Sequence, residues 1–109
     1  MIERRSGQDR RSNERFSVNI DVEWEGFAGK ENGTISDISV SGCFVLCSGE
    51  VEDGDYVKIW FPLTNGKKIQ FMAEIANHVF EIGFGAKFIN LSEAQIDFLE
   101  VFVDTLRED

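Results

Sequence analysis

The chain has 109 residues, of which 42% are hydrophobic and 28% are charged, a composition typical of a single globular domain. Its formal net charge is −9, and so acidic a body would repel a long polyanion, which argues against DNA or RNA as a partner. No run approaches the ~18 apolar residues of a membrane-spanning helix, and the polar N-terminus lacks the apolar core of a signal peptide. We therefore expect a cytoplasmic protein that does not insert into membranes.

Residues 1–15 carry five of the six arginines against three acidic residues. They have no apolar periodicity, so we predict a flexible arginine-rich arm followed by one domain over residues 16–109. Because the rest of the chain is acidic, this arm suits a small discrete anion better than a polymer. A solubilising charged tail is the alternative, and the arm alone does not decide between them.

The segment "FSVNIDVEW" (16–24) alternates strictly between apolar and polar residues, which predicts a strand with one buried face. Asn65-Gly66 predicts a hairpin turn, because both residues tolerate the positive φ of a type I′ turn. Gly83 and Gly85 favour a bend or bulge in the last strand. The other predicted strands span about 33–38, 43–47, 56–63, 67–80 and 82–89.

From Ser92 the period becomes helical. Ser92 and Gln95 form a capping-box pattern, and the apolar residues that follow recur at helical spacing, which predicts a helix over about 92–107. Its aromatic stripe fits packing against the sheet, with a partner surface as the alternative. Five or six short antiparallel strands followed by one helix predict an all-β fold that closes into a small barrel, because closure removes exposed edges.

The sequence offers little for catalysis or metal binding. His78 is the only histidine, so a serine or cysteine nucleophile has no evident base, and a zinc site lacks ligands. Cys43 and Cys47 lie on the same face of a predicted strand, too far apart for a comfortable disulfide, and are expected to be packed thiols. We therefore expect neither an enzyme nor a cofactor.

Two short stretches suit a nucleotide ligand. In "RSNER", Arg11 and Arg15 present planar forks that can grip a phosphate or the O6/N7 edge of guanine. In "DISVSG", Asp37 can accept hydrogen bonds from guanine N1–H and N2–H₂, Ser39 adds a hydroxyl, and Gly42 permits a close backbone approach. Taken alone, the second stretch is better explained as an ordinary Asp/Ser/Gly turn.

Together, R-x-x-x-R before the first strand and D-x-S-x-x-G after the second resemble the PilZ domain family of bacterial cyclic di-GMP receptors. The segment "GFGAKFINLS" and the C-terminal helix extend the resemblance over about residues 10–106. It implies a six-stranded antiparallel β-barrel with the ligand on its surface. It also implies that Arg11 and Arg15 contact guanine and phosphate, while Asp37, Ser39 and Gly42 read the other guanine.

The resemblance and the arginine-rich arm lead to two further expectations. Family members with more arginine before the first strand can hold two stacked ligands, and Arg10 could supply the additional contact. The arm would be mobile when free and ordered by the ligand, creating a surface for a downstream protein partner in second-messenger signalling. The alternative is a PilZ-like protein-interaction module with no nucleotide role. A single-stranded nucleic acid binder is disfavoured, because in "VEWEGF" the aromatic residues alternate with acids.

Overall fold

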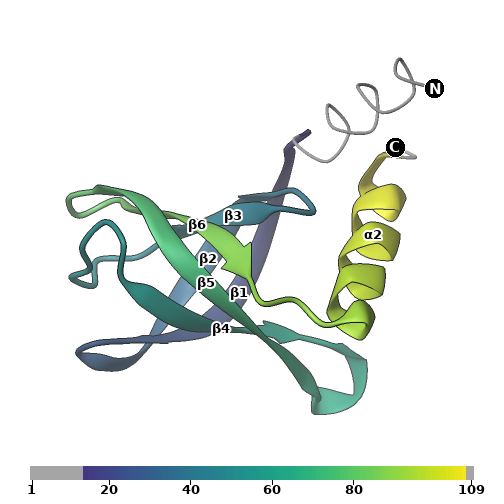
Figure 1. Ribbon diagram of the computed structural model, residues 1–109, viewed down its shortest axis with the longest axis horizontal. Coiled ribbons are helices and arrows are strands. Elements are labelled where there is room, and N and C mark those ends of the chain that lie inside the picture. The colour runs from purple at the N-terminus through teal and green to yellow at the C-terminus, as the bar shows by residue number, and fades with distance from the viewer. Residues whose placement is uncertain (1–13, 108–109) are drawn as a thin grey trace.

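The computed structural model describes residues 14–107, and within them six strands form one closed barrel with an α-helix at one end (Figure 1). All strand pairs are antiparallel, in the order β1-β2-β3-β6-β5-β4, and β4 closes the barrel by pairing with β1. The predicted all-β barrel with a C-terminal helix is confirmed. In chain order the elements are β1 (Phe16–Gly26), β2 (Gly29–Ile38), β3 (Gly42–Leu46), β4 (Tyr56–Pro62), the 3-10 turn η1 (Thr64–Gly66), β5 (Lys68–Val79), β6 (Gly83–Ile89) and α2 (Glu93–Arg107).

The second strand begins earlier than its apolar pattern predicts. β2 starts at Gly29 rather than Gly33, and its first residues pair with the end of β1, with Trp24 opposite Glu31. The stretch "KEN" has no apolar alternation to mark a strand. A ladder of backbone hydrogen bonds to β1 holds it in the sheet instead.

The hairpin between β4 and β5 has the predicted residues in a longer loop. Asn65 and Gly66 both have positive φ, 70° and 75°, as predicted. The connection is not a two-residue turn, however, because Leu63 N–H donates to Lys67 C=O at 2.7 Å around the 3-10 turn η1.

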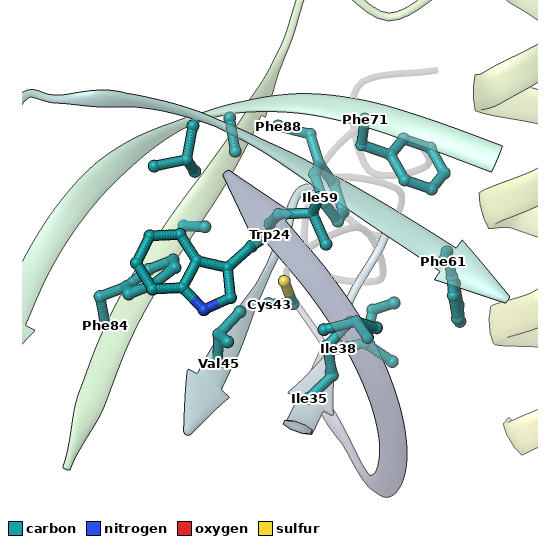
Figure 2. Close-up of a cluster of buried hydrophobic side chains, with 14 of the residues drawn as sticks. Trp24, Ile35, Ile38, Cys43, Val45, Ile59, Phe61, Phe71, Phe84 and Phe88 are labelled. Atoms are coloured by element: carbon teal, nitrogen blue, oxygen red, sulfur yellow. The ribbon is translucent and has the colours of Figure 1, made fainter. Parts of the chain in front are cut away.

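A continuous apolar core fills the barrel (Figure 2). At its centre the Trp24 ring meets the edge of Phe84 with centroids 5.1 Å apart, and both side chains are essentially fully buried. Cys43 lies in this core, and burial, followed by the charge of Asp37, raises the pKa of its thiol to about 12. Cys47 is half-buried, burial raises its pKa as well, and both thiols are free. Neutral, packed thiols suit a structural role, as predicted.

Helix α2 closes one end of the barrel. Ser92 N–H donates to Gln95 Oε1 at 2.7 Å, and Gln95 N–H donates to Ser92 Oγ at 3.1 Å, which is the predicted capping box. The helix buries Leu99 completely, and its Phe98 and Phe102 rings meet Phe61 of β4 at 5.4 and 5.2 Å. The aromatic face of α2 therefore packs against the barrel, and it is not a free surface for a partner. Over residues 14–107, no helix has the length and hydropathy needed to cross a bilayer.

Candidate ligand-binding site

A β-bulge near the end of β2 decides which way Asp37 faces. Ile35 and Ile38 are both buried although they are three residues apart, an odd spacing that a regular strand would send to opposite faces. The register against β3 shifts by one residue between Ile35 and Asp37. Because Ser36 is the extra residue of this bulge, the side chain of Ile38 points into the barrel again and that of Asp37 lies on its outer surface.

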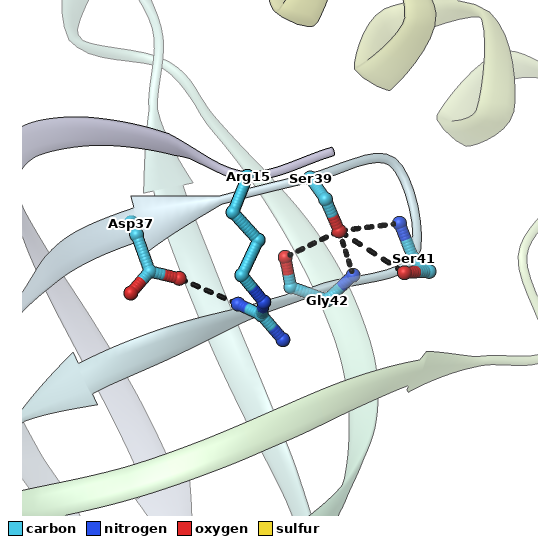
Figure 3. Close-up of polar contacts among 5 residues, drawn as sticks. All are labelled: Arg15, Asp37, Ser39, Ser41 and Gly42. Carbon is cyan, nitrogen blue, oxygen red and sulfur yellow. Dashed lines mark hydrogen bonds and ion pairs between the residues drawn. The ribbon is translucent and has the colours of Figure 1, made fainter. Parts of the chain in front are cut away.

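Arg15 and Asp37 meet on that surface, although 22 residues separate them. Ser17 pairs with Asp37 across β1 and β2, so the residue two positions before Ser17 lies beside the same carboxylate. Arg15 Nη1 donates to Asp37 Oδ1 at 2.5 Å (Figure 3). Their side chains are 51% and 34% exposed, so both groups remain open to solvent and to a ligand.

Ser39 and Gly42 build the turn that follows. Ser39 is 1% exposed, and its Oγ accepts hydrogen bonds from the N–H groups of Ser41 at 3.1 Å and Gly42 at 3.2 Å (Figure 3). Ser39 N–H also donates to Gly42 C=O at 2.8 Å. A Cβ at Gly42 would overlap the carbonyl oxygen of Ala86 on β6, so glycine is needed for the close approach of these strands. Both residues thus hold the turn in shape beside Asp37.

Three residues that the motifs did not single out lie in one row with Asp37. In the barrel register Asp37 pairs with Phe44, Phe44 with Gly85, and Gly85 with Asn77. Phe44 lies between the buried residues Cys43 and Val45, so its ring faces outward. A Cβ at Gly85 would meet Asn77 Oδ1 and lie 3.8 Å from the Phe44 ring, so these two side chains flank Gly85. Asp37, Phe44, Asn77 and Gly85 are far apart in the sequence, and the strand register brings them together, with a bulge in β5 opposite Gly85.

Arg107, near the C-terminus of α2, contacts the segment next to the site. Its guanidinium lies 3.5 Å from Glu14 Oε1, 2.6 Å from Asp104 Oδ1 and 5.4 Å from the centre of the Phe16 ring. These contacts hold the start of β1 against the helix. The one signal in the sequence was that Arg107 is the only arginine outside the first 15 residues.

Of the six predicted ligand-binding residues, Arg15, Asp37, Ser39 and Gly42 gather around the start of β1 and the turn between β2 and β3. Arg10 and Arg11, with most of the predicted flexible arm, lie outside the described residues. No group of three or more His, Cys, Asp or Glu side chains within residues 14–107 could hold a metal ion.

A comparison with known protein families gives one match that spans most of the chain. The family model of the PilZ domain matches residues 9–104. No curated protein matches the chain by sequence.

Three solved structures share the fold at low identity. The PilZ domain of CeSA from a cellulose-synthesizing bacterium matches with a TM-score of 0.65 and 21% identity, over 89% of this chain and 100% of that chain. The PilZ domain of YcgR from Escherichia coli, solved with c-di-GMP, gives a TM-score of 0.71 and 14% identity over 87% and 89% of the two chains. The Borreliella burgdorferi PlzA protein in complex with c-di-GMP gives 0.67 and 14% over 91% of this chain and 43% of PlzA.

Proposed function

Since the chain belongs to the PilZ domain family, we propose that it binds cyclic di-GMP and acts as a signalling effector in the cytoplasm rather than as an enzyme. The observation that carries this proposal is the meeting of Arg15 and Asp37, from two separate motifs, on an exposed surface. Two structural neighbours, YcgR and PlzA, were solved with c-di-GMP, and this supports the choice of ligand.

The two side chains complement different parts of a guanine nucleotide. The Arg15 guanidinium can donate paired hydrogen bonds to guanine O6 and N7 or to a phosphate. The Asp37 carboxylate can accept from N1–H and N2–H₂ of a guanine. Because the ligand carries two guanines and two phosphates, these groups, together with Arg11, could bind one small dianion without a basic protein body.

The Arg15–Asp37 ion pair would open when the ligand binds. Both side chains are at least a third exposed, and pairs of this kind contribute only about 0–1 kcal/mol. Each hydrogen bond from a charged group to the ligand contributes about 1.5–3 kcal/mol. The exchange therefore favours the ligand, and until then the ion pair keeps the two charged groups close to their binding positions.

Ser39 and Gly42 would act mainly by shaping the turn. The hydroxyl of Ser39 is already engaged by two backbone N–H groups, which supports positioning of Asp37 as its main contribution. Phe44, in register beside Asp37, offers an outward ring on which a base could stack. Arg10 would add a contact to a second, stacked ligand.

The proposal predicts a choice between dinucleotides. Adenine presents a donor at position 6, where the arginine fork needs an acceptor, and it has no N2 amine for Asp37. We expect cyclic di-GMP to bind far more tightly than cyclic di-AMP, as measured by isothermal titration calorimetry. Equal affinity for both would contradict a site that reads guanine.

The same titration tests the two residues. Arg15→Ala and Asp37→Ala should each weaken cyclic di-GMP binding at least about tenfold, because each removes a charge-assisted hydrogen bond. Their melting temperatures should stay close to that of the parent, because the lost ion pair is exposed. Lys68→Ala is the matched control, since it removes an exposed cation paired with Glu23 at 2.7 Å and should leave binding unchanged. Loss of the fold in either variant would instead make that residue structural.

The alternative is a protein-interaction module without a nucleotide role. It predicts no binding of cyclic di-GMP to the parent chain in the same calorimetric experiment. The exposed side chains Phe27 and Phe80, 97% and 73% exposed, are compatible with a partner surface under either function.

A further inference from the structure

The end of the barrel away from α2 carries a dense negative charge. Three segments lie together there, and we call them the acidic end: residues 25–29, 47–55 and 79–82 (Figure 1). Segments 47–55 and 79–82 are joined by a hydrogen bond from Cys47 N–H to Ile82 C=O at 3.0 Å. Segment 25–29 lies against segment 47–55, because Phe27 and Asp55 line the same pocket. The segments contain no lysine or arginine and contribute −6 of the chain's formal net charge of −9. Their six carboxylates belong to Glu25, Glu50, Glu52, Asp53, Asp55 and Glu81.

Exposed apolar side chains lie among these carboxylates. Phe27 is 97% exposed, Phe80 73% and Ile82 54%. Single exposed apolar residues are ordinary on a protein surface, but three of them cluster at one end of this small barrel. They contribute nothing to the core, so their burial would stabilise only a complex.

Two pockets at the acidic end are lined by both aromatic rings and carboxylates. A pocket of about 360 Å³ is lined by Phe80, Glu50 and Glu81 together with His78, Ser48 and Gly49. A second pocket, of about 400 Å³, is lined by Phe27, Glu25 and Asp55, but Lys58 of β4 also lines it, together with four uncharged residues of β1, β4 and β5. The first pocket, which no lysine or arginine lines, is therefore the one that suits a basic side chain. An apolar wall beside carboxylates is the surrounding that a long basic side chain needs, because its alkyl stem packs on the ring while its charged head reaches the acids.

We propose that the acidic end docks a basic segment of another protein, with a lysine or arginine side chain entering the pocket between Phe80, Glu50 and Glu81. The charge disfavours nucleic acids and anionic membranes, which carry the same sign. An apolar residue beside the basic one would cover Ile82. The attraction would speed association and weaken as salt rises, since surface charges are screened over about 10 Å at 0.1 M ionic strength.

This surface lies apart from the nucleotide site. Arg15 lies just before β1, next to the Glu14 and Phe16 that contact Arg107 of α2. Glu25 lies at the other end of the same strand, and Phe27 comes just after it. The docking proposal therefore does not rest on cyclic di-GMP binding. It describes a second surface through which the domain could engage a protein.

The test uses the full chain and a short fluorescent peptide of alternating arginine and leucine, with binding followed by fluorescence anisotropy. The double variant Glu50→Lys/Glu81→Lys should weaken binding at least about tenfold, because both carboxylates that line the pocket are reversed. Glu93→Lys/Glu100→Lys on α2 gives the same net charge and should change binding by less than about twofold. Phe80→Ser should also weaken binding, whereas Val101→Ser, a matched change of an exposed apolar residue on α2, should not.

Chemical-shift mapping of the parent chain with the same peptide should perturb amides of residues 47–55 and 79–82. Equal losses in the two charge-matched double variants would overturn the proposal, because they would mean attraction by net charge alone. The proposal would also fail if the peptide did not bind the parent chain, or if sedimentation showed that the acidic end pairs two copies of this chain. Since every substituted side chain is exposed, unchanged melting temperatures will exclude loss of folding as the cause.

Discussion

Asp37 and Ser39 are two positions apart, yet they lie in opposite environments for one physical reason. An ionised carboxylate is costly to bury, so Asp37 stays partly exposed and paired with Arg15. A neutral hydroxyl can be buried once it is hydrogen-bonded, and Ser39 Oγ accepts from two backbone N–H groups. One residue therefore remains available to a ligand while the other stabilises the turn.

Ser39→Ala should lower both stability and affinity. It leaves the N–H groups of Ser41 and Gly42 without their acceptor, which should reduce the free energy of unfolding by about 1–3 kcal/mol. Urea denaturation followed by tryptophan fluorescence measures this loss. Ser48→Ala, a change of an exposed serine outside this turn, should stay within ~0.5 kcal/mol of the parent. If Ser39→Ala weakened cyclic di-GMP binding and left stability unchanged, Ser39 would be a direct ligand contact rather than a positioning residue.

At the scale of elements, α2 is a lid on one end of the barrel. Its apolar face covers Phe61 of β4, and the Phe98 and Phe102 rings stack at 6.0 Å over that opening. Arg107 then contacts Glu14 and Phe16, which connects the last turn of the helix to the segment beside the candidate ligand-binding site. The helix therefore stabilises the barrel and supports the start of β1.

Leu99→Ala tests how much this lid contributes. Leu99 is fully buried, so its truncation should lower the free energy of unfolding by about 2–5 kcal/mol through lost burial and the resulting cavity. Val101→Ala is the matched control on the same helix, 65% exposed, and should change stability by less than ~0.5 kcal/mol. Similar losses for both variants in urea denaturation would mean that α2 does not pack on the barrel through the Leu99 face.

At the scale of the whole molecule, the two ends of the barrel present different polar surfaces. Arg15 and Asp37 lie near the end that α2 covers, whereas the three segments at the other end contain six carboxylates and no lysine or arginine. A small anion and a basic protein can therefore be attracted to different parts of one chain with a net charge of −9. This separation supports a domain that responds to a ligand at one surface and contacts a protein at another.

The number of cyclic di-GMP molecules that the proposed site binds should depend on the arm. We expect two ligands per chain at saturation, with Arg10 contacting the second one. Arg10→Ala should reduce the calorimetric stoichiometry towards one while cyclic di-GMP still binds, because Arg11, Arg15 and Asp37 remain. Arg4→Ala, which removes the same charge farther from β1, should keep the stoichiometry of the parent. A single site in the parent chain would rule out the stacked pair.

The sequence by itself determined the elements and their class. Strict alternation in residues 16–24 predicted β1, the Ser92–Gln95 capping box predicted the start of α2, and Asn65-Gly66 predicted the hairpin. These features are local, because they depend on neighbouring side chains and on the φ values that glycine and asparagine tolerate. The two motifs likewise gave the PilZ family and the candidate ligand-binding residues.

Only the tertiary structure decided which of these residues lie exposed beside one another and which surfaces lie together. The Ser36 bulge sends Asp37 outward, the barrel register adds Phe44 and Asn77 to its row, and the close approach of Ala86 explains Gly42. The acidic end likewise forms from three connections far apart in the chain. The physical reason is that register, bulges and barrel closure arise from pairing between distant strands, which no local pattern of side chains encodes.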